Sequence, residues 1–166
     1  MTGPGGGGGE VSSSAQKRRR RPEPSPTQRA LGLLTRREHS RRELARKLAV
    51  RGVEAVDALA VIDKLTAAGW QDDTRFAESL VRSRAAGGYG PAYVRAELGT
   101  HALASEAVAA ALESYEGDWA ENARDLVSRR HPAALTGDRD ARRKAIDFLL
   151  RRGFAMEHAK AATQPG

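Results

Sequence analysis

The chain has 166 residues, no cysteine and a formal charge of +7, with 28 lysines and arginines against 21 aspartates and glutamates. The lack of cysteine excludes a disulfide framework, a thiolate nucleophile and a thiolate metal site, and no metal-binding motif pairs any of the four histidines, His39, His101, His131 and His158. The basic excess favours an acidic partner, and no apolar run approaches the roughly 20 residues that span a bilayer.

Residues 1–27 are expected to form a disordered tail. They contain GPGGGGGE, SSS, KRRRR and PEPSP, with only Met1, Val11 and Ala15 as apolar residues, too few to offset the entropy cost of ordering. The basic run 17–21 either adds affinity for phosphate or only increases solubility, and the sequence leaves both interpretations open. No apolar stretch follows the charges of the N-terminus, so we expect a cytoplasmic protein without a secretion signal.

From Gln28 onward the apolar spacing predicts helices. The first carries four residues at helical spacing, Ala30, Leu33, Leu34 and Arg37. Ser40 and Glu43 have the spacing of a capping box, in which the hydroxyl and the carboxylate satisfy free amides of a new helix reciprocally. This second helix is expected to turn Leu44 and Leu48 inward.

Two glycines are expected to end the next helical segments. Gly52 stands where a left-handed residue stops the second helix. The third helix, residues 54–68, is expected to stop at Gly69 and to bury Val56, Leu59, Ile62 and Leu65. No segment alternates with period two, so the sequence predicts an all-α fold.

Asp72 and Asp73 follow this stop and precede a fourth helical pattern that includes Phe76. A carboxylate at such a position accepts hydrogen bonds from first-turn amides and complements the helix dipole. A metal site or an acid–base pair would need similar groups at a recognisable spacing, and the sequence offers none. We therefore expect the pair to cap a helix, and we expect no catalytic, cofactor-binding or metal-binding residues.

A glycine-rich segment, Gly87, Gly88, Tyr89 and Gly90, then precedes Pro91. The glycines are expected to end the fourth helix, and Pro91 is expected at the first position of the next helix. A phosphate-binding loop would need G-x-G-x-x-G after a strand, or a following G-K-[ST], and neither is present.

The chain also repeats itself. The segment from residue 40, SRRELARKLAVRGVEAVDALAVIDKL, aligns with the segment from residue 90, GPAYVRAELGTHALASEAVAAALESY. A third, truncated copy reads ARRKAIDFLLRRGF. In this copy Gly153 occupies the position that Gly52 has in the first. This similarity predicts tandem three-helix, helix-turn-helix-like repeats that form an elongated, curved array. We expect a first repeat with a linking helix over 28–86, a second repeat over 87–131, and a third, truncated repeat over 132–166.

Four motifs, spread over roughly residues 28–162, resemble those of the RecX family of recombination regulators. In chain order they are RREHSRRELARKL, GWQDDTRFAESLVRSR, GYGPAYVRAEL and FLLRRGF. The resemblance implies a bacterial regulator in DNA repair and the SOS response. It would bind the RecA recombinase, chiefly as a RecA filament on single-stranded DNA, and inhibit its ATPase, strand-exchange and coprotease activities. Where the family usually has glycine and isoleucine after the second E-L, this chain has Ala102 and Leu103, so a softer helix stop is expected there.

Arginines supply the candidate partner-binding surface, because a guanidinium pairs bidentately with phosphate or carboxylate. Arg75, Ser79 and Arg82 lie on one stripe of the fourth helix, opposite Phe76. A second cluster lies in the first repeat and consists of Arg36, Arg37, Arg41, Arg42, Arg46 and Lys47. Any single arginine could equally belong to a solvated face balanced by glutamates, so the collective excess carries the prediction.

Three aromatic residues, Trp70, Tyr89 and Trp119, could stack on nucleic-acid bases, but aromatic residues beside helix ends are more often packing anchors, and we expect packing. The phenylalanines are expected in the cores, at Phe76, Phe148 and Phe154.

Two classes of function stay open. The first is a non-enzymatic, monomeric regulator of the recombinase filament, with no cofactor, no membrane contact and at most weak, non-specific contact with DNA. The second is a stand-alone helical nucleic-acid-binding module, because three-helix units resemble helix-turn-helix readers. Base readout, however, needs Asn or Gln on a recognition helix, and the folded region holds only Asn122 and a few scattered glutamines.

Overall fold

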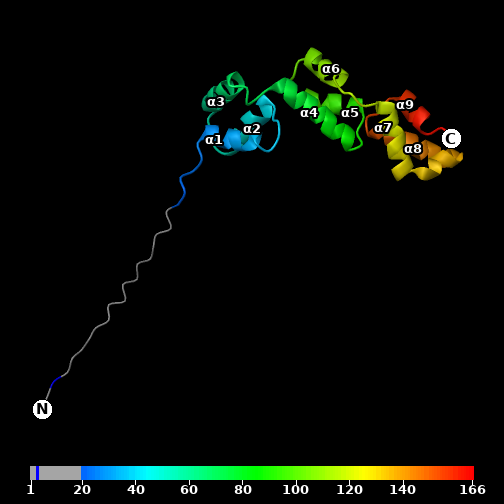
Figure 1. Cartoon of the computed structure of the whole chain (residues 1–166), viewed down its shortest axis with the longest axis horizontal. Coiled ribbons are helices and arrows are strands. Elements are labelled where there is room, and N and C mark those ends of the chain that lie inside the picture. Colours follow the sequence, from blue (N-terminus) through cyan, green and yellow to red (C-terminus); the bar gives the residue numbers. More distant parts are fainter. Residues whose placement is uncertain (1–2, 4–19) are drawn as a thin grey trace.

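The computed structural model describes residue 3 and residues 20–166, and in that part of the chain every regular element is a helix (Figure 1). The α-helices are α1 (Pro26–Leu34), α2 (Arg41–Val50), α3 (Ala55–Ala67), α4 (Asp73–Ala86), α5 (Pro91–Gly99), α6 (Ser105–Glu113), α7 (Trp119–Arg130), α8 (Arg139–Arg151) and α9 (Met156–Ala162), with a 3-10 helix, η1 (Pro132–Thr136), before α8. The predicted all-α fold is confirmed. The disorder expected for residues 1–27 concerns positions that lie mostly outside the described residues.

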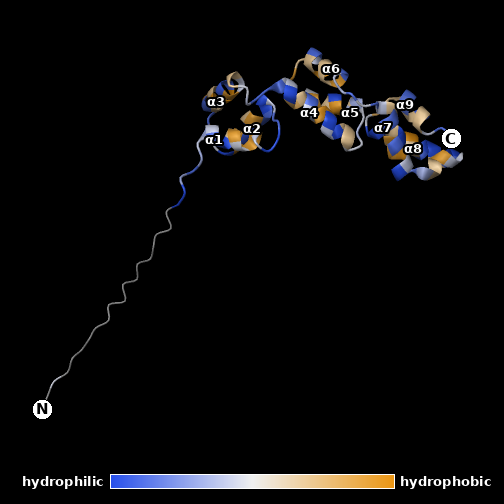
Figure 2. Cartoon of the chain, in the orientation of Figure 1, coloured by the Kyte–Doolittle hydropathy of each residue, from blue (hydrophilic) through white to orange (hydrophobic). Residues whose placement is uncertain are grey.

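The helices form three groups that follow one another along the long axis, namely α1–α3, α4–α6, and α7–α9 with η1 (Figure 1). Each group encloses its own apolar core, and hydrophobic stretches appear in all three groups in Figure 2. The most buried core residues include Leu44, Leu48 and Ile62 in the first group, Phe76, Val94 and Leu98 in the second, and Val127, Leu149 and Phe154 in the third. The chain is therefore an elongated row of three-helix repeats, as predicted.

The limits of the repeats differ from those expected from the sequence. α4, expected to link the first repeat to the next, buries Phe76, Ala77 and Val81 in the second core. α7 in the same way contributes Leu126 and Val127 to the third core. The second repeat therefore begins with α4, one helix before residue 87, and the third begins with α7, one helix before residue 132. The sequence alignment started from the S-R-R-E-L helix, which is the second helix of its unit, and so it displaced the two internal boundaries by one helix.

The first two helices begin at serine caps of different completeness. Ser25 begins α1 inside the expected tail: its hydroxyl accepts from the Gln28 amide at 3.1 Å, and Gln28 Oε1 accepts from the Ser25 amide at 2.9 Å. This reciprocal pair is a complete capping box. At α2 the Ser40 hydroxyl accepts from the Glu43 amide at 3.1 Å, but the Glu43 carboxylate is bound elsewhere, so the box expected there is only half formed. α1 ends before Arg37, which therefore lies beyond the helix that was expected to carry it.

α3 buries two of the four residues expected to be buried: Ile62 and Leu65 lie in the core, but Val56 and Leu59 do not. Val56 and Leu59 are 80% and 55% exposed, whereas Ala58, Ile62 and Leu65 are buried. The buried set follows i, i+4, i+7, which is one stripe of a helix. The sequence contains two overlapping apolar stripes here, and only the packing of α3 against α2 selects between them.

Left-handed residues end the equivalent second helices of the three repeats. Gly52 and Gly153 have φ of +83° and +92°, as the repeat alignment predicts. The middle repeat has Ala102 at this point, with φ of +56°, the one non-glycine residue with positive φ in the described chain. A left-handed backbone costs a residue with a Cβ roughly 1–2 kcal/mol. Ala102 adopts the conformation of the two glycines at this cost, and the softer stop expected from the sequence stays a prediction.

Gly90 and Gly153 join the second and third repeats back to back. The Gly90 amide donates to the Arg152 carbonyl at 2.8 Å, and the Ala92 amide donates to the Gly153 carbonyl at 3.0 Å. Gly90 precedes Pro91 at the start of α5, with φ of −92°, a conformation open to any residue. A Cβ at Gly90 would nevertheless stand 2.4 Å from the carbonyl carbon of Gly153. Close approach of two backbones, rather than backbone freedom, requires glycine at this position.

Aromatic side chains pack around this contact. The rings of Tyr89 and Tyr93 stack with centroids 4.2 Å apart, and the Arg152 guanidinium lies 4.6 Å from the centroid of Tyr89. The same guanidinium lies 5.3 Å from the ring of Phe148. Trp119 packs against both the second and the third cores. Tyr89 and Trp119 are therefore packing residues.

We predict that Gly90→Ala lowers the free energy of unfolding by about 1–3 kcal/mol, because its Cβ must push the second repeat away from the third. Gly87→Ala is the matched control, since Gly87 has φ of −79° and a Cβ there would meet nothing closer than 3.5 Å. Urea unfolding of both variants beside the parent checks the prediction. Equal midpoints for the two variants would show that the glycine contact does not hold the repeats together.

Candidate partner-binding surface

The first and second repeats meet at a polar junction. Asp73, the first residue of α4, accepts from the Arg41 amide, the first amide of α2, at 3.0 Å, and from Gln71 Nε2 at 2.9 Å. Gln71 is buried and also donates to the His39 carbonyl at 3.3 Å. Asp72 accepts from an amide in the first turn of its own helix at 3.0 Å. The structure thus places Asp72 as the cap of α4, whereas Asp73 caps a helix of the neighbouring repeat.

Two buried or half-buried histidines belong to this junction. His39 Nδ1 lies 3.0 Å from the Arg37 carbonyl and Nε2 lies 3.2 Å from Lys47 Nζ. A carbonyl only accepts and an ammonium only donates, so Nδ1 carries the proton and the ring is neutral. Burial lowers the pKa of His39, although the hydrogen bond to the carbonyl opposes this. His101 shares a hydrogen bond of 2.6 Å with the Ser40 hydroxyl across the junction, and burial also lowers its pKa.

Glu43 is a buried carboxylate that holds two of the predicted partner-binding residues. Arg37 donates to it through both terminal nitrogens, and Lys47 Nζ lies 3.5 Å from Oε1. Burial raises the pKa of Glu43, but the hydrogen bond from Arg37 and the positive charges around the carboxylate outweigh burial and lower the pKa to about 2. Glu43 is therefore ionised at neutral pH, and its ion pairs keep Arg37 and Lys47 bound within the first repeat.

Arg75 fastens the start of α4 to the first repeat. Its Nε donates to Glu38 Oε1 at 3.0 Å, and its Nη2 donates to the carbonyls of residues 69 and 70 at 2.8 and 3.2 Å. Arg41 is engaged in a similar way by Asp63 of α3. Both guanidiniums therefore serve contacts within the chain.

The predicted partner-binding residues thus fall into two sets. The first set forms ion pairs within the chain and consists of Arg37, Arg41, Lys47 and Arg75. The second set is exposed, forms no ion pair among the described residues, and consists of Arg36, Arg42, Arg46 and Arg82. The stripe expected on α4 is divided between the two sets, so that only its C-terminal arginine is available to a partner.

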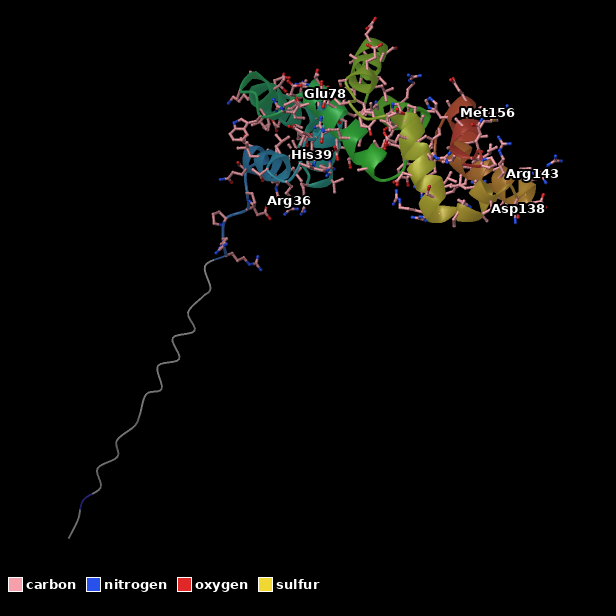
Figure 3. The ribbon with its side chains drawn as sticks, turned by 45° about the vertical axis from the view of Figure 1, so that its right-hand side comes forward. Arg36, His39, Glu78, Asp138, Arg143 and Met156 are labelled. Carbon is pink, nitrogen blue, oxygen red and sulfur yellow. The ribbon has the colours of Figure 1, made fainter. Side chains whose placement is uncertain are left out.

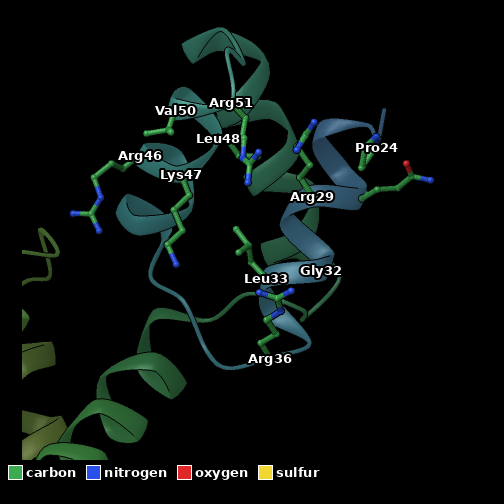
Figure 4. A pocket seen from close by; sticks show the side chains of 11 residues that line it. Pro24, Arg29, Gly32, Leu33, Arg36, Arg46, Lys47, Leu48, Val50 and Arg51 are labelled. Atoms are coloured by element: carbon green, nitrogen blue, oxygen red, sulfur yellow. The ribbon is translucent and has the colours of Figure 1, made fainter. Parts of the chain in front are cut away.

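A groove of about 600 Å³ opens between α1 and α2, and we call it the basic groove (Figure 4). Its cations are Arg29 and Arg36 on the α1 side, and Arg46, Lys47 and Arg51 on the α2 side. The residues that line it include no aspartate or glutamate. Arg29 and Arg51 were not predicted to bind a partner. Each stands apart from the arginine pairs in the sequence, and only the packing of α1 beside α2 places them in this groove.

Charged side chains project from every group of helices (Figure 3), but their surroundings differ. In the third repeat Arg143, labelled in Figure 3, pairs with Asp140 one turn away, and Arg129 pairs with Asp125. The basic groove has no such interleaving of opposite charges along its walls. It is therefore the strongest candidate for an acidic partner in the described chain.

Trp70 is 55% exposed, so it is not the packing anchor expected from the sequence. It follows the glycine that ends α3, and its carbonyl rather than its ring is held by α4. Stacking of a base on Trp70 stays an untested alternative.

Metal-binding and membrane-spanning features are lacking in the described residues. No three or more His, Asp or Glu side chains gather there in a way that could hold a metal ion. None of the helices formed by residues 20–166 combines the length and apolar character needed to cross a membrane.

The three repeats match three family models in chain order. Residues 27–65, 72–112 and 116–163 match the models described as the first, second and third three-helix domains of RecX. Regulatory protein RecX of Stenotrophomonas maltophilia (strain K279a) is 64% identical over 142 residues, which cover 86% of this chain and 87% of the relative. Regulatory protein RecX of Xanthomonas axonopodis pv. citri (strain 306) is 60% identical over 142 residues, covering 86% and 88%.

A solved structure shows the same fold. The crystal structure of RecX from Lactobacillus salivarius aligns with a TM-score of 0.69 and 22% identity, over 82% of this chain and 91% of that chain. The likeness in three dimensions therefore extends beyond clear sequence similarity.

We predict that acid removes the stabilisation supplied by Glu43. The pKa of Glu43 is lowered from an ordinary value of 4.5 to about 2, so the stabilisation is fully present above pH 4.5 and is lost as the pH falls towards 2. The expected loss is roughly 2–3 kcal/mol. The lowered pKa values of His39 and His101 act in the same direction at higher pH, below about 6.5.

Urea unfolding as a function of pH measures this effect. Glu43→Gln should flatten the dependence between pH 4.5 and 2, whereas Glu113→Gln, at an exposed position in α6, should retain the slope of the parent. A parent-like slope in Glu43→Gln would contradict the role assigned to this carboxylate.

Proposed function

Since the chain belongs to the RecX family of regulatory proteins, we propose that it regulates the RecA recombinase by binding the RecA filament on single-stranded DNA. We propose further that it inhibits the filament's ATPase, strand-exchange and coprotease activities. It acts as a cytoplasmic monomer and performs no catalysis of its own. The match of all three repeats, in order, to the three RecX domains is the observation that supports the proposal most strongly.

The shape of the chain suits a partner with a repeating surface. Three units stand in a row, so their outer faces form one extended surface rather than a closed pocket (Figure 1). A filament presents equivalent sites at regular intervals along its axis, and an elongated row can contact more than one of them. Multiple weak contacts along one chain bind more tightly than any single contact does.

The alternative function, a stand-alone reader of nucleic-acid sequence, has less support. Adenine is read by the amides of Asn or Gln, which must be free to meet the base edge. The chain has one asparagine, Asn122, and its Nδ2 donates to the Tyr115 hydroxyl at 2.8 Å. Gln71 is buried in the junction, and Gln28 completes the cap of α1. These amides serve the fold rather than a base.

The proposal predicts that the chain lowers the rate of ATP hydrolysis by a RecA filament assembled on single-stranded DNA. The measurement follows ATPase activity as increasing amounts of chain are added. In parallel, affinity for the same DNA is measured without the recombinase, and capture on immobilised RecA is compared with and without nucleotide and DNA. The chain should be captured best on the assembled filament, and its affinity for naked DNA should be weak and independent of sequence.

Unchanged ATPase activity, together with tight binding to one DNA sequence, would replace this proposal with the reader alternative. Unchanged RecA ATPase activity together with no capture of the chain on the filament would also contradict the regulator proposal.

A further inference from the structure

We propose that the basic groove of the first repeat binds the sugar-phosphate backbone of single-stranded DNA. The proposal deepens the proposed function and rests on it, because it assigns contact with the DNA of the filament to one site of the chain. The groove lies between α1 and α2, and cations line both of its walls (Figure 4).

The charges of the groove call for an anion. Arg29, Arg36, Arg46 and Arg51 line the groove and form no ion pair among the described residues, with the Arg46 guanidinium at its outer edge, turned away from α1 (Figure 4). Like charges gathered on one surface repel one another, and a bound polyanion relieves that repulsion. Elsewhere in the first repeat and its junction, Arg37, Arg41 and Arg75 have carboxylate partners, and Arg42 is an exposed arginine without one among the described residues. The groove is thus the place in this repeat where several unpaired arginines gather.

The spacing of the cations favours a chain of phosphates over a single anion. Arg29 lies in the first half of α1 and Arg36 lies just beyond its last residue, so these two cations stand at opposite ends of the α1 wall (Figure 4). The α2 wall offers a second series, Arg46, Lys47 and Arg51. Pro24 also lines the groove, and the basic run 17–21 precedes it closely in the chain. The groove thus presents a series of cations on each wall, which suits a linear polymer of uniform charge.

The lining favours the backbone of the polymer over its bases. No aromatic residue lines the groove, so it offers no platform for stacking. Its amide, Gln28, is occupied in the cap of α1, and the remaining lining includes apolar side chains such as Leu33 and Leu48. Four of the five cations are arginines, whose planar fork matches the oxygens of a phosphate. Binding at this site is therefore independent of sequence.

An acidic protein segment is the competing ligand. Arginine also pairs with carboxylates, but an acidic segment would not present a regular row of charges to both walls of the groove. The phosphate backbone does so, because every nucleotide carries one negative charge.

The test compares two double charge reversals that differ only in where they lie. Arg36→Glu with Arg46→Glu reverses one cation on each wall of the groove. Arg42→Glu with Arg82→Glu reverses two exposed arginines outside it, and Arg42 lies on the α3 side of α2, beside a separate groove. The affinity of each full-length protein for a fluorescent oligothymidine is measured by anisotropy over a range of salt concentrations, without the recombinase.

The groove variant should bind on the order of tenfold more weakly than the parent near 0.1 M salt, and its plot of log affinity against log salt should be flatter by about 1.4. This value corresponds to two lost contacts, at about 0.7 each for a single strand. The control variant should keep the slope of the parent. Arg36→Ala with Arg46→Ala, which introduces no repulsion, should lose the same slope if the two arginines contact phosphate.

Three results would overturn the proposal. The first is that the parent fails to bind oligothymidine, and the second is that both charge-reversal variants lose the same salt slope. The third is that polyglutamate binds the parent as tightly as DNA does, and that only the groove variant binds polyglutamate more weakly. The last result would assign the groove to an acidic protein. Because the recombinase is absent throughout, none of these results depends on whether the chain inhibits the filament.

Discussion

The carboxylate of Asp73 fixes how the row of repeats begins. It belongs to α4, yet it accepts the first amide of α2 and the side chain of Gln71, so one oxygen joins two repeats. The first and second cores are separate clusters that share no side chain among the described residues. Their relative placement therefore depends on directional polar contacts. The second and third repeats are joined differently, by the approach of Gly90 to Gly153 and by aromatic packing around it.

The polar junction also determines which charges are left for a partner. Arg75 and Arg37 are held by carboxylates of the first repeat, whereas Arg36 and Arg46 line the basic groove and form no ion pair among the described residues. A buried, ionised group such as Glu43 requires its cations to remain in place, since losing one partner would leave a charge unpaired in the interior. Some arginines thus hold the fold together and others are left for a partner, and the packing of the helices decides which arginines do which. This division between structural and available arginines is the central claim of our account.

Local patterns predicted much of the fold but little of the candidate site. The helices, the stop at Gly52 and the repeats follow from spacing and cap chemistry that act within a few residues. The buried face of α3 did not follow, because two apolar stripes overlap and the neighbouring helix selects one, leaving Val56 exposed. The groove depends on contacts between helices: nothing near Arg29 or Arg51 in the sequence distinguishes them from solvated arginines. The sequence also could not predict that Asp73 caps α2 of the first repeat, because an aspartate that caps its own helix and one that caps a neighbouring helix have the same local sequence pattern.

The most direct test of the central claim is the urea unfolding of two single charge reversals on exposed arginines. Arg75→Glu removes three hydrogen bonds at the junction and places a carboxylate beside Glu38, so it should lower the free energy of unfolding by about 1–3 kcal/mol. Arg46→Glu, in the groove, should stay within about 0.5 kcal/mol of the parent. Equal effects of the two reversals, or a larger loss for Arg46→Glu, would contradict the division of the arginines between structure and partner.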